Sequence, residues 1–168
     1  MLHGSSSKLA SIWGASKNDA IIAGLLHDIG KCLTRKEMLA LCVRNGLEVY
    51  DFEIYDNLEA LHGKVGSLIF EKEFNKNDIA RFNSISNAIK NHIAGSEDMS
   101  LLDKIVFIAD NVEPAKGNDI LHKIETGEIT NINKCVKMLI EEKIKRASLK
   151  NREINPLLMN TLEGLDER

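Results

Sequence analysis

Residues 100–114 read Ser-Leu-Leu-Asp-Lys-Ile-Val-Phe-Ile-Ala-Asp-Asn-Val-Glu-Pro and carry the strongest helix signal in the chain. Ser100 and Asp103 have the spacing at which each side chain satisfies a free backbone amide at a helix start. The apolar residues 105–109 follow, and Pro114 ends the segment because proline cannot continue a helical hydrogen-bond ladder. The sequence therefore predicts a helix that begins near Ser100.

The rest of the chain shows the same kind of pattern. Apolar residues recur at intervals of three and four, which is the period of a helix buried on one face, and proline occurs only twice. Capping signals and this period predict six further helices: from Arg35, over about 18–28, 60–74, 77–93 and 132–149, and from Asn155-Pro156. We therefore predict an all-α fold of about six or seven helices. We expect residues 45–58 to form a loop or a short strand-like stretch that covers the functional site of the protein.

Length and composition indicate one folded domain spanning residues 1–168. The chain has 43% hydrophobic and 28% charged residues, as in ordinary globular proteins, and a formal net charge of −3. Neither a signal peptide nor an apolar run long enough to span a bilayer is present, so no membrane association is expected. Three cysteines without a Cys-x-x-Cys pair predict no disulfide framework, and this favours a reducing cytoplasm.

The charge pattern gives little support for nucleic-acid binding. Basic residues gather over residues 134–152, but Glu141 and Glu142 interrupt them, and only 5% of the chain is aromatic. A solvated helix face explains this cluster, and no nucleic-acid partner is expected.

Histidines and aspartates at the ends of apolar stretches form the candidate site. His27 and Asp28 follow the apolar run 20–26, whereas His62, His92 and Asp110 stand on predicted helices among apolar neighbours. Imidazole and carboxylate groups together bind divalent cations, and a carboxylate can bridge two of them. Taken singly, each histidine is also compatible with a hydrogen-bonded core residue, and Asp110 with an ion pair to a lysine.

Three acidic residues share one face of the helix that starts near Ser100. Asp103, Asp110 and Glu113 lie at positions i, i+7 and i+10. This face could hold cations against phosphate oxygens if it lay opposite the histidines, or it could simply be solvated. The spacing leaves both alternatives open.

The order His27-Asp28, His62, His92, Asp110 resembles the HD superfamily of metal-dependent phosphohydrolases. The local sequences of residues 24–31, 61–66 and 92–114 are similar to the YqeK branch of that superfamily. This resemblance runs from about Lys8 to Ala147, and its most specific part is the stretch from His92 to Pro114.

The resemblance implies an HD-domain helical bundle that holds two divalent metal ions, commonly iron, with manganese or zinc also compatible. It implies symmetrical hydrolysis of dinucleoside tetraphosphates, so that diadenosine tetraphosphate gives two ADP. By resemblance Asp28 bridges the two ions and takes part in catalysis. His27 and Asp110 complete one ion, whereas His62 and His92 bind the other and also take part in substrate binding.

Lys31 by resemblance points into the phosphate site, where its ammonium group holds a phosphate oxygen in binding and catalysis. Its alternative role is that of a solvated cation near a helix end, which the helix dipole favours. Glu113 suits a structural role as well as a catalytic one.

The chain departs from the family pattern at its start. The HD pattern begins with one more histidine on a preceding helix, and His3 lies about five residues too late for that position. On a helix this offset rotates a side chain by about 140°. We therefore expect that the chain lacks the first N-terminal helix of the family.

Three further alternatives remain open at this stage. The substrate could be a mononucleotide, because the metal pattern fixes the reaction type better than the leaving group. The chain could also be a non-catalytic module that senses a nucleotide, which the missing histidine favours. A homodimer is compatible too, since the apolar residues of the helix from about Asn131 suit an interface or the core equally well.

Overall fold

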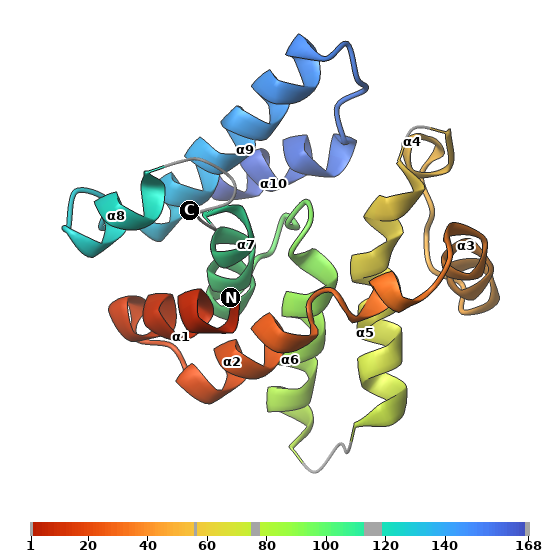
Figure 1. Cartoon of the computed structure of the whole chain (residues 1–168), viewed down its shortest axis with the longest axis horizontal. Coiled ribbons are helices and arrows are strands. Elements are labelled where there is room, and N and C mark those ends of the chain that lie inside the picture. Colours follow the sequence, from red (N-terminus) through yellow and green to blue (C-terminus); the bar gives the residue numbers. More distant parts are fainter. Residues whose placement is uncertain (1, 56, 75–77, 113–118, 167–168) are drawn as a thin grey trace.

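A computed structural model describes residues 2–55, 57–74, 78–112 and 119–166, and within these ranges the chain is all-α (Figure 1). The described residues contain ten α-helices, two short 3-10 helices and no strand. The α-helices are α1 (Leu2–Trp13), α2 (Lys17–Leu26), α3 (Arg35–Arg44), α4 (Asp51–Tyr55), α5 (His62–Glu73), α6 (Ile79–Asn91), α7 (Leu101–Asn111), α8 (Ile120–Glu125), α9 (Ile132–Leu149) and α10 (Pro156–Asp166). The 3-10 helices are η1 (Ile29–Cys32) and η2 (Leu58–Leu61). The all-α prediction is confirmed.

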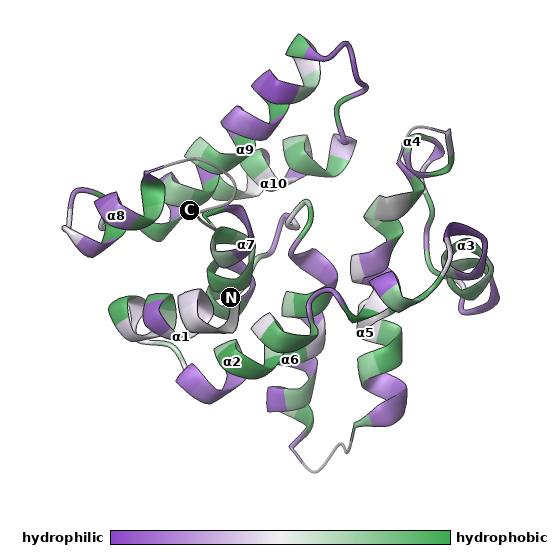
Figure 2. Cartoon of the chain, in the orientation of Figure 1, coloured by the Kyte–Doolittle hydropathy of each residue, from purple (hydrophilic) through white to green (hydrophobic). Residues whose placement is uncertain are grey.

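Helix α7 is the central element of the fold. It packs against α1, α2, α6 and α9, and residues 102–109 on it are all buried. Figure 2 shows this helix mostly in the colour of hydrophobic residues, whereas α9 alternates between hydrophobic and hydrophilic. The buried face of α9 contains Cys135, Val136, Leu139 and Ile140. These four residues of α9 therefore belong to the core, whereas Leu149 at the end of the helix is exposed.

The capping signals in the sequence define the starts of several helices correctly. At both Thr34 and Ser100 the side chain accepts a backbone N–H, and the acidic side chain three residues later accepts the backbone N–H of the capping residue. Asn131 caps α9, which spans the predicted residues 132–149. Asn155 Oδ1 accepts the N–H of Leu157 at the start of α10, as its position before Pro156 predicts.

Three helices that the sequence did not predict account for the higher count. Helix α1 contains a run of serines, which form helices poorly, but it packs on α2 and α7 and buries Leu9 and Ala10. Helix α8 is only six residues long. Helix α4 lies where we expected a loop or strand-like stretch, and that prediction is wrong for Asp51–Tyr55.

The described part of the chain contains no helix with the length and apolar character needed to cross a membrane.

Candidate metal centre

The segment after α2 presents His27 and Asp28. His27 is the C-cap of α2, so the helix ends one residue before it, and Asp28 precedes η1. Nδ1 of His27 donates to the carbonyl oxygen of Gly24 at 2.9 Å. Because that bond uses the Nδ1 proton, the neutral ring presents an Nε2 lone pair on its other side.

His92 is held in the same way at the end of α6. It is the C-cap of that helix, only 1% exposed, and its Nδ1 donates to the carbonyl oxygen of Ile89 at 2.7 Å. Burial holds the pKa of His92 well below its ordinary value, and the charges of His62 and His27 add to this effect. The ring is therefore neutral at physiological pH, the form that binds a metal.

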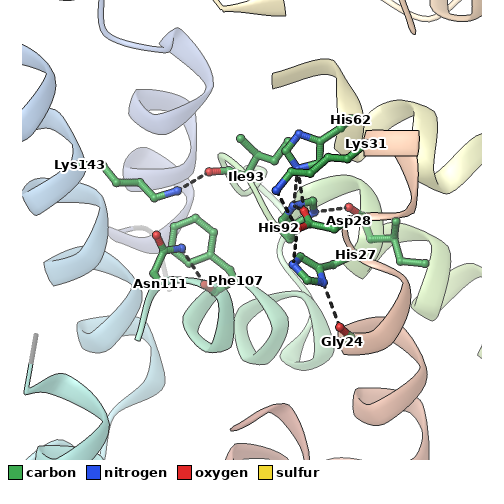
Figure 3. Close-up of polar contacts among 11 residues, drawn as sticks. Gly24, His27, Asp28, Lys31, His62, His92, Ile93, Phe107, Asn111 and Lys143 are labelled. Atoms are coloured by element: carbon green, nitrogen blue, oxygen red, sulfur yellow. Dashed lines mark hydrogen bonds and ion pairs between the residues drawn. The ribbon is translucent and has the colours of Figure 1, made fainter. Parts of the chain in front are cut away.

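His62 is the first residue of α5 and meets His92 across the site. Their Nε2 atoms lie 3.0 Å apart, and the ring centroids 4.9 Å. The rings of His27 and His92 are also close, with centroids 5.0 Å apart at nearly a right angle. Figure 3 shows the three imidazoles converging on the carboxylate of Asp28.

The two oxygens of Asp28 face different histidines. Oδ2 lies 3.3 Å from Nε2 of His27, and Oδ1 lies 3.2 Å from Nε2 of His62. Oδ1 is buried, and no hydrogen-bond donor for it is found among the described residues. Ligand atoms of His27, Asp28 and His92 all lie within 4.8 Å of one another.

Electrostatics keep the Asp28 carboxylate ionised. Burial alone would raise its pKa, but the close contacts with His27, His62 and Lys31 outweigh burial and hold the pKa far below its ordinary range. An ionised carboxylate whose two oxygens face imidazole nitrogens fits a divalent cation, and so do imidazoles that converge on one carboxylate.

Asp110 lies within electrostatic reach of the histidines. Burial opposes a charge on His27, but Asp28 and the Gly24 carbonyl together raise the pKa of His27 above its ordinary value, and the charge of Asp110 contributes. The charge of Asp110 also acts on His92 in the same direction. The structure thus brings His27, Asp28, His62 and His92 together, and Asp110 interacts electrostatically with two of these histidines.

Lys31 contacts the centre through Asp28. Lys31 lies on η1, and its Nζ donates to Oδ2 of Asp28 at a distance of 2.7 Å. The side chain is otherwise more than half exposed. Lys31 and His62 line a cavity of about 550 Å³ together with Thr34 and Arg35. Two cationic side chains and no carboxylate are found among its described lining residues, so this cavity suits an anion.

Of the acidic face expected on α7, Asp103 has a structural role at the start of the helix. Asp103 is buried, accepts the backbone N–H of Ser100 at 3.0 Å, and contacts Asn91 Nδ2 at 3.4 Å. It therefore caps α7 and links it to α6. Glu113 and the side chain of His3 lie outside the described residues.

Sequence reasoning did not predict how closely the backbone of η1 approaches the start of α5. A Cβ atom on Gly30 would overlap with the carbonyl oxygen of His62, so only glycine lets η1 lie this close to α5. Gly30 belongs to the motif of residues 24–31, but the motif alone gives no reason for a glycine at this position. This contact sets how near Asp28 comes to His62.

Lys143 is a second residue that sequence reasoning missed. From α9 its Nζ donates to the carbonyl oxygen of Ile93 at 2.6 Å and lies 4.9 Å from the centroid of the Phe107 ring (Figure 3). It supports the backbone directly after His92. No sequence signal distinguished it from the other lysines of α9.

Comparison with known proteins identifies the family. The model of the HD domain matches residues 5–115, a range that contains all five candidate ligands. This chain is a member of the HD domain family.

Related HD proteins have informative names. A protein of Halalkalibacterium halodurans named symmetrical bis(5'-nucleosyl)-tetraphosphatase is 31% identical over 94% of this chain and 81% of its own length. A Bacillus subtilis protein with the same name is 26% identical over 89% of this chain and 77% of its own. A crystal structure from Clostridium acetobutylicum, described as a predicted HD superfamily hydrolase involved in NAD metabolism, superposes with a TM-score of 0.85. It is 28% identical and covers 99% of this chain and 86% of its own.

Proposed function

We propose that this HD domain hydrolyses dinucleoside tetraphosphates symmetrically, so that diadenosine tetraphosphate and water give two ADP. The observation that carries the proposal is the Asp28 carboxylate, whose Oδ2 faces His27 and whose Oδ1 faces His62. A carboxylate in this position suits a bridge between two cations. The names of the relatives from Halalkalibacterium halodurans and Bacillus subtilis support the same activity.

The proposed centre holds two divalent ions. His27 and Asp110 would hold one, His62 and His92 the other, and Asp28 would contact both. Mixed imidazole and carboxylate ligands suit iron, manganese or zinc, and we propose iron because the chain resembles the YqeK branch, in which iron is common. Bound divalent ions lower the pKa of water and neutralise phosphate oxygens, which is the chemistry this reaction needs.

The side chains around the centre supply binding and orientation. Lys31 would release Asp28 Oδ2 and hold a phosphate oxygen of the substrate, and Arg35 lies in the same cavity. His62 also lines that cavity, so it stands between the centre and the bound phosphates. The carbonyls of Gly24 and Ile89 keep the rings of His27 and His92 oriented throughout.

We further propose that residues 1–168 act as one HD domain. Helix α9 lies outside the matched residues 5–115, yet it packs on α7 and supports the backbone after His92 through Lys143. A homodimer and a cytoplasmic location stay predictions. Sedimentation of the purified protein would test the dimer.

The test is anaerobic purification with added iron, followed by metal counting and product analysis. Two metal ions per chain, with ADP as the sole product from diadenosine tetraphosphate, are expected. AMP together with ATP would contradict symmetrical cleavage. Faster turnover of mononucleotides than of diadenosine tetraphosphate would favour a mononucleotide phosphohydrolase. Bound but intact nucleotide would indicate a nucleotide-sensing module.

A further inference from the structure

A second cavity adjoins the one that contains His62. Its volume is about 270 Å³, and Ala60 and Ile93 line both cavities. A ligand that reaches from the first cavity into the second would therefore pass over these two residues. The volume lies just below the range for small-molecule sites, roughly 300–1,000 Å³, and suits one nucleoside better than a whole dinucleotide.

Four segments of the sequence form the wall of this second cavity. They are the segment around α4, η2 with the start of α5, the end of α6 with the loop that follows it, and the start of α10. Helix α10 lies outside residues 5–115, the part that matches the HD domain. The cavity therefore combines the shared HD scaffold with a helix that the HD match does not include.

The two cavities differ in charge. The first is lined by Lys31 and Arg35, whereas three glutamates line the second, against Lys64 and Lys90. Phosphates would be repelled from carboxylates and attracted to the first cavity. The second cavity suits a neutral group that forms hydrogen bonds.

The chemistry of the second wall fits a base and a ribose. Leu157 and Ile93 offer apolar contact, and Tyr50 offers an aromatic ring. The side-chain amides of Asn91 and Asn160 can donate to and accept from the edge of a base. Carboxylates such as Glu97 accept hydrogen bonds from ribose hydroxyls.

Buried contacts hold one side of this wall rigid. Lys64 Nζ donates to Glu53 Oε2 at 2.7 Å and to the carbonyl oxygen of Glu48 at 2.8 Å. The backbone N–H of Tyr50 donates to the same carboxylate oxygen at 2.9 Å. These bonds tie the segment before and within α4 to α5, only two residues after His62.

The opposite side is held by α10. Thr161 Oγ1 donates to the carbonyl oxygen of Ala94 at 2.9 Å. A Cβ atom on Gly164 would overlap with the carbonyl oxygen of Glu97, so α10 and the loop after His92 are in close backbone contact. Both walls are therefore formed before a ligand arrives, which lowers the entropic cost of binding.

We propose that the second cavity binds one nucleoside of the substrate while the phosphates extend over Ala60 and Ile93 to the metal centre. This inference rests on the proposed function, since it assigns a subsite to a dinucleoside polyphosphate. Asn160 on α10 contacts the base or ribose in this arrangement, and α10 contributes to substrate choice.

The test compares Asn160→Trp, which fills the cavity, with Met159→Trp, which places the same ring at an exposed neighbour that does not line it. Calorimetric titration of the metal-loaded protein with ADP and with inorganic pyrophosphate separates nucleoside binding from phosphate binding. We expect Asn160→Trp to weaken ADP binding at least tenfold and to leave pyrophosphate binding within twofold of wild type. Met159→Trp should match wild type with both ligands.

Two results would overturn the inference. One is unchanged ADP affinity in Asn160→Trp, and the other is an equal loss for ADP and pyrophosphate. Hydrolysis of diadenosine tetraphosphate by the wild-type protein is measured separately. If that hydrolysis is absent, the proposed function fails, and the titrations still decide whether the cavity binds a nucleoside.

Discussion

The backbone of Gly30 lies against the carbonyl oxygen of His62 so closely that no side chain fits between them. This contact joins the turn that presents Asp28 to the first residue of α5. It fixes the separation of two candidate metal ligands without any side chain of its own.

Gly30→Ala should therefore destabilise the protein and disturb the centre. The added methyl group must push η1 away from α5, at a cost of about 1–3 kcal/mol in the free energy of unfolding. We expect a lower urea midpoint together with fewer bound metal ions. Gly4→Ala is the matched control, because a Cβ atom there meets nothing within 4 Å and alanine favours a helix. Equal metal content and stability in both variants would contradict this account of Gly30.

Asp28→Asn should prevent the binding of two metal ions at the proposed centre. The amide is neutral and has only one acceptor oxygen, so it cannot neutralise or bridge two cations. We expect at most one ion per chain and a fall in hydrolysis of at least about 1,000-fold, or roughly 4 kcal/mol of barrier. Asp119→Asn is the control, since Asp119 pairs with Lys123 on the surface. Two bound ions in Asp28→Asn would disprove the bridging role.

Lys31→Met should weaken the handling of phosphate and leave the metal count unchanged. Loss of the ammonium group is expected to lower kcat/KM by about 10- to 100-fold, or about 1.4–2.7 kcal/mol. Lys36→Met provides the comparison, because Lys36 is exposed and does not line the cavity with His62. Wild-type kinetics in Lys31→Met would show that Lys31 is a solvated cation that does not hold a phosphate oxygen.

Glu53→Gln should lower stability through the buried pair with Lys64. The two side chains are almost completely buried and 2.7 Å apart, so removing one charge leaves the other without compensation. We expect a loss of about 3–5 kcal/mol in the free energy of unfolding by urea. Glu73→Gln removes an exposed partner of Lys72 and should change little. If Glu53→Gln were as stable as its control, the rigid wall around α4 would lose its basis.

The three cysteines should differ in reactivity. Cys32 is exposed, whereas Cys42 and Cys135 are buried, and burial raises the pKa of Cys135 to about 12. A disulfide reagent such as DTNB at pH 8 should modify one thiol per folded chain and all three after unfolding. Since the folded pKa lies above the ordinary value of 9.0, the stability that Cys135 contributes is complete below pH 9 and declines as the pH rises toward 12. The stability difference between wild type and Cys135→Ala should shrink over that window.

Local signals account for what could be predicted of the fold. The caps at Thr34 and Ser100 and the apolar period of α9 depend on neighbouring residues, so the sequence displays them directly. Helix α1 forms because Leu9 and Ala10 pack against other helices, and this contact outweighs the weak helix preference of its serines. Packing of that kind has no local signal.

In the candidate site, too, some features have local sequence signals and others depend on contacts between distant residues. The histidines and Asp28 were found through their motifs, and the structure places them together. Asp103 and Asp110 lie seven residues apart on one face of α7, but their roles differ. Asp103 accepts the backbone N–H of Ser100 at the start of the helix, whereas the charge of Asp110 acts on His27. Lys143 contacts a carbonyl 50 residues away in sequence, and spacing within one helix cannot reveal such a partner.

The docking of α10 has a consequence for the order of folding. Thr161 closes its hydrogen bond to Ala94 across 67 residues, and a contact of that separation forms late, because a long loop must close first. During synthesis the residues that match the HD domain leave the ribosome before α10 exists. A nascent chain could thus assemble its metal ligands before it has a complete second cavity, and it would gain the proposed selectivity among nucleotides only after α10 has docked.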